Sequence, residues 1–317
     1  MRSSGSPARS AIRNPQSAVV RPLLKWAGGK RQLLPQLRRF YPPAFSRYIE
    51  PFLGSGAVFF DLLGSGRLEG HDVTLIDANP DLIGCYETVR DSTSAVADAL
   101  EQLAAGHARE GNAFYYRVRN QRFNPERARR RDADGRIAYT PALAAMFIYL
   151  NRTGYNGLFR VNSQGAFNVP AGRYARPDIV NRERLVTVAQ ALTSSRVRLQ
   201  CASFTTVLDI ARPDDFLYID PPYEPLSRTA SFTSYTHQRF NARDQIDLHQ
   251  AVLVLARRGC HVLLSNSTAQ HITALYDRND DARRAGLRTL RVEARRAVNS
   301  NATRRGPVFE YVITNRP

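Results

Sequence analysis

Lysine is nearly absent from this basic sequence. Of its 45 basic residues only Lys25 and Lys30 are lysine, and both lie in the segment 24–30 (LKWAGGK). A lysine ammonium is a compact charge on a flexible stem, whereas an arginine guanidinium is a planar fork, so the two are not interchangeable. We therefore predict that this segment holds sites that need a compact cation, beside glycines that let a ligand approach the backbone closely.

Cysteine and long apolar runs are also scarce. Cys85, Cys201 and Cys260 are odd in number, far apart and without metal-ligand spacing, so we predict reduced thiols and no metal site. No apolar run approaches the roughly 18 residues of a membrane span, and residues 1–20 are polar and basic without the apolar core of a secretion signal. We expect a cytoplasmic, nucleoid-associated protein with no membrane partner, no evident obligate protein partner and a disordered basic tail over 1–20.

The formal net charge of +17 predicts a polyanionic partner, with nucleic acid as the first candidate. Residues 117–184 hold 14 arginines against 5 acidic residues, a net charge of +9, and include a predicted charged loop at 127–131. A charged run usually forms only a solvated face, and a generally basic proteome is a second alternative. Here, however, the arginines are interspersed with Tyr155, Phe159, Phe167 and Tyr174, a mixture typical of a nucleic-acid surface.

Apolar patterns alternate between strands and helices along most of the chain. Strands are predicted at 47–52, 73–77, 197–201, 216–219, 261–264, 287–292 and 309–314, and helices at 57–63, 94–103, 113–121, 141–151, 183–192 and 243–257. This alternation predicts an α/β fold in which a parallel sheet has helices on both faces and an antiparallel pair at one edge. Ligands of such sheets bind beyond the carboxyl ends of the strands, where Gly54, Asp77 and Asp220 are predicted to meet.

A glycine turn, Gly54-Ser55-Gly56, separates the first strand from its helix, and Asp77 ends the next strand. The spacing is close to that of a nucleotide-binding βαβ unit, whose acid binds a ribose hydroxyl. Asn79 and Pro80 are predicted to be the N-cap and the first residue of the following helix. The turn lacks the full G-x-G-x-x-G of NAD-binding proteins, and 28–30 lacks the G-x-x-x-x-G-K-[ST] of a phosphate loop, which argues against an ATPase.

The tetrapeptide Asp220-Pro221-Pro222-Tyr223 closes the apolar run 216–219. Neither proline can donate to a sheet ladder, so the strand must end there. The Asp220 carboxylate and the Pro221 carbonyl can then accept both hydrogen bonds of one exocyclic NH2 group, while Tyr223 stacks on the ring that carries it. The alternative is a plain proline turn in which Asp220 serves only as a cap.

Four motifs in this order resemble those of Dam-type (D12 class) site-specific DNA adenine N6-methyltransferases. They are KWAGGK at 25–30, EPFLGSG at 50–56, NRTGYNGL at 151–158 and DPPY at 220–223, within a likeness that covers about 23–315. The resemblance implies a Rossmann-like S-adenosylmethionine-dependent methyltransferase sheet in a catalytic domain at 21–80 and 181–317. It also implies an inserted, mostly helical DNA-recognition domain at 81–180 that contains a β-hairpin, although the arginine-rich segment 127–137 departs from the family pattern.

The resemblance implies roles for individual residues as well. The S-adenosylmethionine site would comprise Trp26, Lys30, Phe52, Gly54, Gly56, Asp77 and Asp220, with Asp77 on the ribose. The target adenine would be held at Asp220, Pro221, Pro222 and Tyr223. DNA would be contacted by Lys25, Tyr155, Asn156, Leu158, Arg160, Asn162, Pro170, Arg173 and Tyr174. Tyr155 would enter the base stack and Arg160 would read guanine, whereas Asn162 and Arg173 would hold phosphates.

The implied activity is methyl transfer from S-adenosylmethionine to adenine N6 in double-stranded DNA, within GATC, by base flipping and direct in-line transfer. The alternatives are an adenine methyltransferase of a restriction-modification system with another recognition site and an inactive DNA-binding relative. Methylation of RNA or of a protein amide is a further alternative, for which related folds usually carry Asn at the position of Asp220. The polar segment 225–233 is predicted to be a mobile lid over the flipped base.

Overall fold

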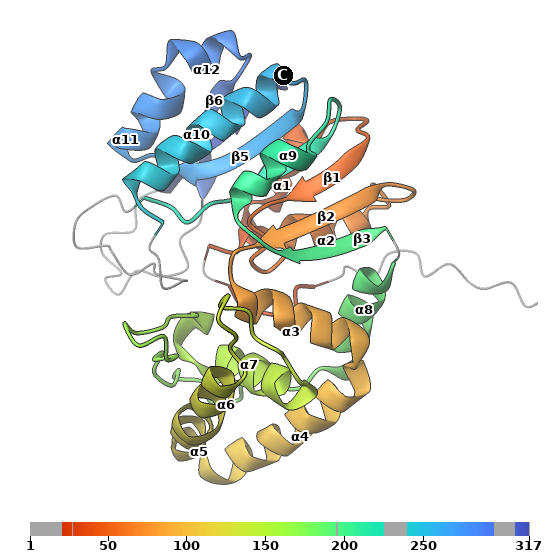
Figure 1. Ribbon diagram of the computed structural model, residues 1–317, viewed down its shortest axis with the longest axis vertical. Helices are drawn as coiled ribbons and strands as arrows, with labels where there is room; N and C mark the ends of the chain where they lie inside the picture. The colour runs from red at the N-terminus through yellow and green to blue at the C-terminus, as the bar shows by residue number, and fades with distance from the viewer. Residues whose placement is uncertain (1–20, 27, 195, 225–239, 295–307, 317) are drawn as a thin grey trace, which may run out of the picture.

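A seven-stranded sheet with the strand order β3-β2-β1-β4-β5-β7-β6 forms the upper half of the molecule in Figure 1. Its strands are β1 Arg47–Glu50, β2 Asp72–Asp77, β3 Val197–Cys201, β4 Phe216–Ile219, β5 His261–Ser267, β6 Arg288–Ala294 and β7 Val308–Thr314. Strands β1 to β5 are parallel, and β7 pairs antiparallel with both β5 and β6. The predicted parallel sheet with an antiparallel pair at one edge is therefore confirmed.

The computed structural model describes residues 21–26, 28–194, 196–224, 240–294 and 308–316. The predicted tail at 1–20 and the predicted lid at 225–233 lie outside these ranges.

The order of the strands reverses between β1 and β4. From β1 the chain moves outward to β2 and then β3, and it returns to place β4 on the other side of β1, with Ile49 opposite Leu217. At such a switch point the connections leave in opposite directions, so a crevice opens at the carboxyl ends of the two central strands. Asp220 follows β4 directly at this edge, and the glycine turn at 54–56 follows β1.

Side chains of β4 alternate between two buried clusters, one on each face of the sheet. Phe216 and Tyr218 belong to the first cluster, and Leu217 and Ile219 to the second, as the period of two along a strand requires. Helices α2 Ala57–Gly64, α3 Pro80–Asp91 and α8 Arg182–Thr193 contribute to the first cluster. Helices α9 Val207–Ile210, α10 Ala242–Arg257, α11 Gln270–Ile272 and α12 Asp280–Arg284 accompany the second.

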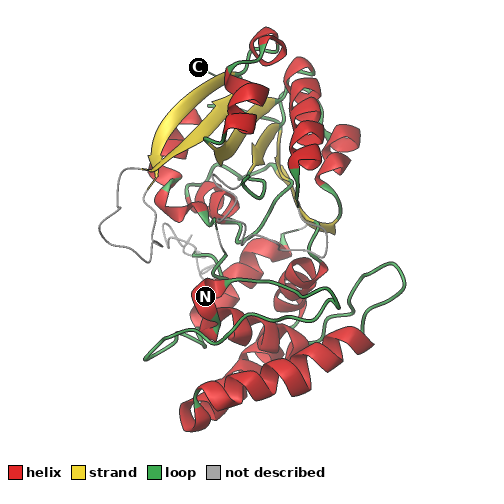
Figure 2. Cartoon of the chain, turned by 90° about the vertical axis from the view of Figure 1, so that its left-hand side faces the viewer, coloured by secondary structure: helices red, strands yellow, loops and turns green. Residues whose placement is uncertain are grey.

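The lower half of the molecule is built mainly from helices (Figures 1 and 2). These are α4 Thr93–Glu110, α5 Asn112–Arg117, a π-helical turn Val118–Phe123, α6 Asn124–Arg129 and α7 Pro141–Thr153. Their buried side chains, such as Leu100 and Phe147, belong to the same cluster as Tyr48 and Phe216 of the sheet. The helical half therefore shares a continuous core with one face of the sheet.

Shorter elements connect these parts. They are α1 Leu34–Leu37, the 3-10 helices Lys30–Gln32, Arg38–Phe40, Tyr155–Gly157 and Phe204–Thr206, and a π-helical turn Thr273–Asp277. Asn79 caps α3 through its side chain, which accepts hydrogen bonds from the backbone N–H groups of Asp81 and Leu82, and Pro80 is the first helical residue. Both predictions for the start of α3 are confirmed.

The charged loop predicted at 127–131 is wrong. Helix α6 extends to Arg129, and Arg127 is buried. The Arg127 guanidinium forms a two-pronged ion pair with buried Asp81, with Nε 2.6 Å from Oδ1 and Nη2 2.7 Å from Oδ2, and it also donates to the Gly165 carbonyl. Tyr139 donates a further hydrogen bond to Asp81 at 2.8 Å. Arg127 thus links α6 to α3 inside the protein and is not part of a solvated face.

Candidate active site and nucleic-acid interface

Lys30 and Asp220 form an ion pair at the switch point. Lys30 Nζ lies 2.9 Å from Asp220 Oδ1, and the two side chains are 6% and 18% exposed. The same ammonium donates a hydrogen bond to the Gly28 carbonyl at 2.8 Å. Oδ1 of Asp220 has no aligned hydrogen-bond donor among the described residues, so this oxygen has a charge partner and unused capacity to accept a hydrogen bond.

Tyr223 completes this charged cluster. Lys30 Nζ lies 4.4 Å from the centre of the Tyr223 ring, over its face, and the Tyr223 hydroxyl donates to Glu310 Oε2 of β7 at 2.7 Å. A cation over an aromatic face is attracted by the negative face of the ring. The Tyr223 side chain is therefore held by a hydrogen bond at its hydroxyl and by the Lys30 charge over one face of its ring.

Asp220 sits in surroundings that disfavour its charge. Burial raises the pKa of Asp220 to about 6, although the nearby Lys30 ammonium opposes this shift. Near neutral pH the carboxylate is ionised and can accept hydrogen bonds, but it loses this ability in mildly acidic solution. The ion pair with Lys30 thus keeps a partly buried acid in its acceptor form.

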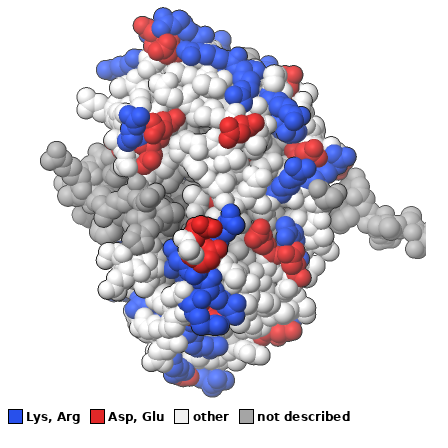
Figure 3. Space-filling model, viewed as in Figure 1, with Lys and Arg blue, Asp and Glu red and all other residues white. Residues whose placement is uncertain are grey.

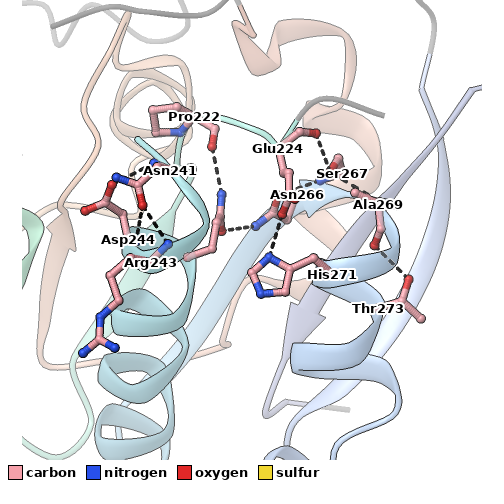
Figure 4. Close-up of polar contacts among 11 residues, drawn as sticks. Pro222, Glu224, Asn241, Arg243, Asp244, Asn266, Ser267, Ala269, His271 and Thr273 are labelled. Atoms are coloured by element: carbon pink, nitrogen blue, oxygen red, sulfur yellow. Dashed lines mark hydrogen bonds and ion pairs between the residues drawn. The ribbon is translucent and has the colours of Figure 1, made fainter. Parts of the chain in front are cut away.

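Two carbonyls of the proline turn are occupied, and one is not. The Pro222 carbonyl accepts from Gln245 Nε2 at 3.0 Å, and the Glu224 carbonyl accepts from Ser267 Oγ at 3.0 Å (Figure 4). Among the residues that the structure describes, none donates to the Pro221 carbonyl. The two acceptors predicted for one NH2 group, on Asp220 and Pro221, are therefore both able to accept.

The glycine turn after β1 is tied to the end of β2. Asp77 accepts hydrogen bonds from the backbone N–H of Gly54 at 3.0 Å and of Asn79 at 2.9 Å. Gly54 has a φ of 49° and Gly56 a φ of 69°, the left-handed region in which glycine is favoured. Burial raises the pKa of Asp77 to about 6, and the two amides oppose the shift. Asp77 thus orders the turn, while part of its carboxylate capacity is used by the backbone.

Trp26 lies against this turn. A Cβ atom at Gly54 would come within 2.9 Å of Trp26 Cδ1, so the position requires glycine for space as well as for its φ. Trp26 also stacks on Phe159, with ring centres 6.2 Å apart and an interplanar angle of 15°. Trp26 thereby links the glycine turn to the helical half of the molecule.

An aromatic cluster beside the turn was only partly predicted. Phe52 stacks on Phe204 with ring centres 5.4 Å apart and meets Phe240 edge-on at 5.7 Å. Phe204 follows the carboxyl end of β3, so its distance from a predicted strand end was a signal that could have identified it. Phe240 lies just before α10, where the sequence carried no comparable signal.

Glu50 is a further acid at this edge that was not proposed as a site residue. It is buried at the end of β1, and Tyr48 donates to its Oε2 at 2.8 Å. Burial raises the pKa of Glu50 well above its usual range, with the negative charges of Asp220 and Asp77 adding to the effect. Burial and the two neighbouring carboxylates thus all disfavour the charged form of Glu50.

The predicted DNA-contacting residues gather on two paired segments of the helical half. The backbone N–H of Tyr155 donates to the Pro170 carbonyl at 2.9 Å, and isolated antiparallel bridges join Gly154 to Ala171 and Val161 to Phe167. Tyr155 is 48% exposed, and Asn156 has a left-handed φ of 53°. Tyr155 thus projects from a sharp, well-anchored turn, as predicted for an aromatic outside the core.

Lys25 is fixed beside this surface by Asn151. The Asn151 side chain accepts from the Lys25 N–H at 2.9 Å and donates to the carbonyls of Lys25 at 2.7 Å and Gly157 at 3.0 Å. Lys25 Nζ lies 4.0 Å from the centre of the Tyr174 ring. Burial lowers the pKa of Lys25, and the neighbouring Arg152 charge contributes in the same direction. The two lysines of the chain therefore occupy two different clusters.

Not every aromatic or polar residue of the predicted surface is available to a ligand. Phe159 and Phe167 are buried in the core, so their assignment to a nucleic-acid surface is wrong. Asn162 accepts from the N–H groups of Gln164 and Ala166 and so shapes its own turn. Arg160 donates from Nε to Asn168 Oδ1 at 2.7 Å. The remaining predicted contacts, Leu158, Pro170 and Arg173, are partly or fully exposed.

Basic side chains are not confined to the helical half. On the face drawn in Figure 3 they appear over both halves of the molecule, with acidic side chains among them. The excess of arginine at 117–184 is also reduced locally by ion pairs with acids outside this segment, such as Arg117–Glu110 and Arg127–Asp81. Net charge in a sequence window therefore overstates the free positive charge of this half.

A cavity of about 500 Å³ lies between α3, the end of β3 and Arg136-Ile137. None of the predicted site residues lines it, but its lining residue Ala202 donates its N–H to the Asp77 carbonyl, so the cavity adjoins the end of β2. Across the described ranges, no group of His, Cys, Asp and Glu side chains is arranged to hold a metal ion. None of the helices in that part of the chain has the length and hydrophobicity to span a bilayer.

The seven-stranded sheet with its reversal at β1 and β4 is a mixed α/β fold consistent with a Rossmann-like methyltransferase. A sequence profile of D12 class N6 adenine-specific DNA methyltransferases matches residues 26–298. The chain belongs to this family and is an adenine-specific DNA methyltransferase.

Relatives of two kinds support this assignment. The chain is 35% identical to the type II methyltransferase M1.LlaDCHI of Lactococcus lactis subsp. cremoris, over 93% of this chain and 95% of the relative. It is 37% identical to the type II methyltransferase M.MjaIII of Methanocaldococcus jannaschii, over 93% and 99%. It is 34% identical to the DNA adenine methylase of Escherichia coli K12, over 94% and 96%.

Proposed function

We propose that this protein transfers a methyl group from S-adenosylmethionine to adenine N6 within GATC in double-stranded DNA, with the adenine flipped out of the duplex. The observation that carries the proposal is the turn after β4, where Tyr223 adjoins a charge-paired Asp220 and a Pro221 carbonyl that accepts from no donor in the described part of the chain. This combination offers two acceptors and an aromatic face to one planar amine. The same edge of the sheet holds the glycine turn and Asp77.

The residues at the switch point fit S-adenosylmethionine. Asp77 would hold the ribose hydroxyls, the glycine turn and Trp26 would border the amino-acid part, and Phe52 and Phe204 offer an aromatic surface for the adenine ring. Because S-adenosylmethionine has no pyrophosphate, the missing third glycine of the dinucleotide motif is not an obstacle. When bound, the sulfonium supplies an electrophilic methyl group.

The task of the protein is then to prepare the amine. The adenine amine is a weak nucleophile because its lone pair is delocalised into the ring. Hydrogen bonds from its two N–H groups to Asp220 and the Pro221 carbonyl favour a pyramidal nitrogen and stabilise the positive charge that develops on it. Tyr223 would stack on the adenine and limit its orientation. The Lys30 ammonium lies next to the Asp220 carboxylate and over the face of the Tyr223 ring. It would therefore have to move away when the amine binds there.

Recognition of the duplex is proposed for the paired segments 154–162 and 168–174, together with Lys25. Exposed Tyr155 would fill the space left in the base stack by the flipped adenine. Arg160 would donate two hydrogen bonds to a guanine, and Leu158 and Pro170 would contact a thymine methyl group. Arg173 and Asn162 would contact phosphates.

There are two alternatives to this proposal, one suggested by the relatives and the other weighed against the site. Type II methyltransferases among the relatives favour membership in a restriction-modification system. An inactive DNA-binding relative is disfavoured by the intact turn at 220–223 and the ordered turn at 54–56.

The test is transfer of labelled methyl groups to duplexes that differ only at one GATC site, followed by digestion with a methylation-sensitive nuclease. We expect label only in the GATC duplex and only on adenine. The Asp220→Ala variant should lose transfer while it still binds DNA. Label at adenines outside GATC would replace the proposed site by that of the alternative, and substantial turnover by Asp220→Ala would overturn the role of the turn.

A further inference from the structure

Two buried amide side chains lie behind the proline turn. Gln245 stands in the first turns of α10 and Asn266 near the end of β5, and both are almost completely buried. Asn266 Nδ2 donates to Gln245 Oε1 at 3.1 Å, and Gln245 Nε2 donates to the Pro222 carbonyl at 3.0 Å (Figure 4). The two side chains form a relay, which we define as Asn266, Gln245 and the Pro222 carbonyl.

The orientation of both amide groups in the relay is determined by a hydrogen bond at Asn266. The Asn266 oxygen accepts from the backbone N–H of Ser267 at 2.8 Å, so the NH2 group of Asn266 must face Gln245. This forces the Gln245 oxygen toward Asn266 and its NH2 group toward Pro222, because an amide offers donors on one side only. A backbone N–H, which cannot be reversed, thus determines which end of Gln245 faces the catalytic turn.

Among the described residues, no backbone N–H donates to the Pro222 carbonyl. Strand β4 ends at Ile219, opposite Leu264, whereas β5 continues to Ser267. Beside this extension the chain is Asp220-Pro221-Pro222, and prolines have no N–H with which to continue the ladder. The turn is therefore held by side chains of α10, β5 and α11. Gln245 of α10 donates to Pro222, Ser267 of β5 donates to the Glu224 carbonyl, and His271 Nδ1 of α11 lies 2.9 Å from Glu224 Oε2.

We propose that Gln245 and Asn266 are positioning residues for methyl transfer. By holding the Pro222 carbonyl they fix the peptide group between Pro222 and Tyr223. They thereby direct the Pro221 carbonyl on one side of it and the Tyr223 ring on the other at the target amine. This inference rests on the proposed role of the turn. Neither side chain touches the amine, so the relay acts on the rate of transfer at a bound adenine rather than on the affinity for DNA or cofactor.

The directionality makes a specific expectation for Asn266→Asp. An aspartate keeps the oxygen that accepts from Ser267 but presents a second oxygen to Gln245. Gln245 then has to turn its NH2 group toward the aspartate, which leaves its oxygen against the Pro222 carbonyl. Asn266→Ala does not force this reversal, so it should be the milder change. Gln245→Glu produces the same clash directly, and Gln245→Met removes the donor without adding charge.

The experiment measures steady-state kcat for methyl transfer, KM for S-adenosylmethionine and Kd for a duplex that the wild type methylates. We expect kcat to fall by between about tenfold and a hundredfold in Gln245→Glu, Gln245→Met and Asn266→Asp, with KM and Kd within about twofold of wild type. The double variant Gln245→Glu with Asn266→Asp should be no worse than the poorer single variant, because the two residues act through one carbonyl.

Asn315→Asp provides the matched control. Asn315 is an amide that joins the other end of β5, where it accepts from the Val262 N–H and donates to the Cys260 carbonyl. Asn315→Asp adds the same charge beside the opposite end of β5 without contact to the turn, so its kcat should equal that of wild type once folding is confirmed by Tm. An equal loss of kcat in Asn315→Asp, a wild-type kcat in Gln245→Met, or an Asn266→Ala variant slower than Asn266→Asp would overturn the relay. Failure of the proposed function is separate, since it would show in the wild type and in Asp220→Ala.

Discussion

Lys30 Nζ lies 2.9 Å from Asp220 Oδ1, although one residue precedes the first strand of the sheet and the other follows the fourth. Burial pushes the pKa of Asp220 upward, and the Lys30 charge holds it down to about 6. The pair therefore sets the pH range in which this carboxylate can accept a hydrogen bond. It also places one of only two lysines of the chain at the proposed reaction centre.

Replacing Lys30 should move the acid limb of the pH profile. Because the proposed reaction needs an ionised Asp220, wild-type kcat/KM for DNA at saturating cofactor should fall as pH decreases through about 6, since this ratio reports the DNA-free enzyme in which Lys30 contacts Asp220. Lys30→Met removes the charge that opposes the burial effect, so the Asp220 pKa rises and kcat/KM begins to fall at a higher pH. Lys30→Arg retains a positive charge and should leave the limb closer to that of wild type. An unmoved limb in Lys30→Met would show that Asp220 does not govern it.

Asp77 does not confuse this measurement. Its pKa also lies at about 6, but its proposed role is to hold the cofactor, so its protonation should appear in KM for S-adenosylmethionine rather than in kcat/KM for DNA at saturating cofactor. The two carboxylates are thus separated by measuring both constants across the same pH range.

Phe204 should contribute to cofactor affinity. It stacks on Phe52 at the edge where the proposed cofactor site lies. Aromatic pairs of this kind contribute about 0.5–1.5 kcal/mol beyond their buried area, so Phe204→Leu should weaken S-adenosylmethionine binding by roughly two- to tenfold. Isothermal titration of the cofactor in the absence of DNA measures this directly.

Phe45→Leu is the control for that variant. Phe45 packs on Phe216 and His71 close to the amino end of β1, away from the proposed site. Its replacement should lower Tm without changing cofactor affinity. Equal affinities of Phe204→Leu and wild type would remove Phe204 from the site.

Much of the sheet could be predicted because its signals are local. The strand at 216–219 is apolar throughout and is ended by prolines, and the start of α3 is marked by Asn79 and Pro80. The site residues that were predicted lie at strand ends or in short motifs, where residue type and spacing alone carry chemical meaning.

What could not be predicted depends on partners that are distant in the sequence. Nothing near Arg127 shows that it alone, among neighbouring arginines, meets a buried carboxylate at Asp81. Phe159 and Phe167 stand among arginines and glycines, and only the packing of α7 and Trp26 against them reveals that they are core residues. The relay of Gln245 and Asn266 joins a helix to a strand, so neither segment shows it alone.

Arg160 and Arg173 should differ in their effects on sequence choice. If Arg160 reads a guanine, Arg160→Ala should relax discrimination at one base pair by about 1–3 kcal/mol and leave the other positions unchanged. Arg173→Ala should weaken binding to all sequences alike and reduce the salt dependence, as expected for a phosphate contact. Asn168→Ala releases the Arg160 side chain and should act in the same direction as Arg160→Ala, but less strongly. Binding competition among duplexes with single substitutions measures all three, and a uniform loss in Arg160→Ala would assign it to a phosphate.

Replacing Arg127 alone in its buried pair with Asp81 should destabilise the protein more than replacing both residues. Arg127→Met leaves the Asp81 carboxylate buried without its counter-charge, a change that costs about 3–5 kcal/mol in other proteins. Combining Arg127→Met with Asp81→Asn removes the stranded charge and preserves an acceptor for the Tyr139 hydroxyl, so this double variant should recover a large part of the loss. Arg129→Met, on the same helix, breaks only an exposed contact with Glu126 and should cost less than about 1 kcal/mol. Urea denaturation of the four proteins gives the free energies of unfolding, and a double variant as unstable as Arg127→Met would mean that the stranded charge is not the source of the cost.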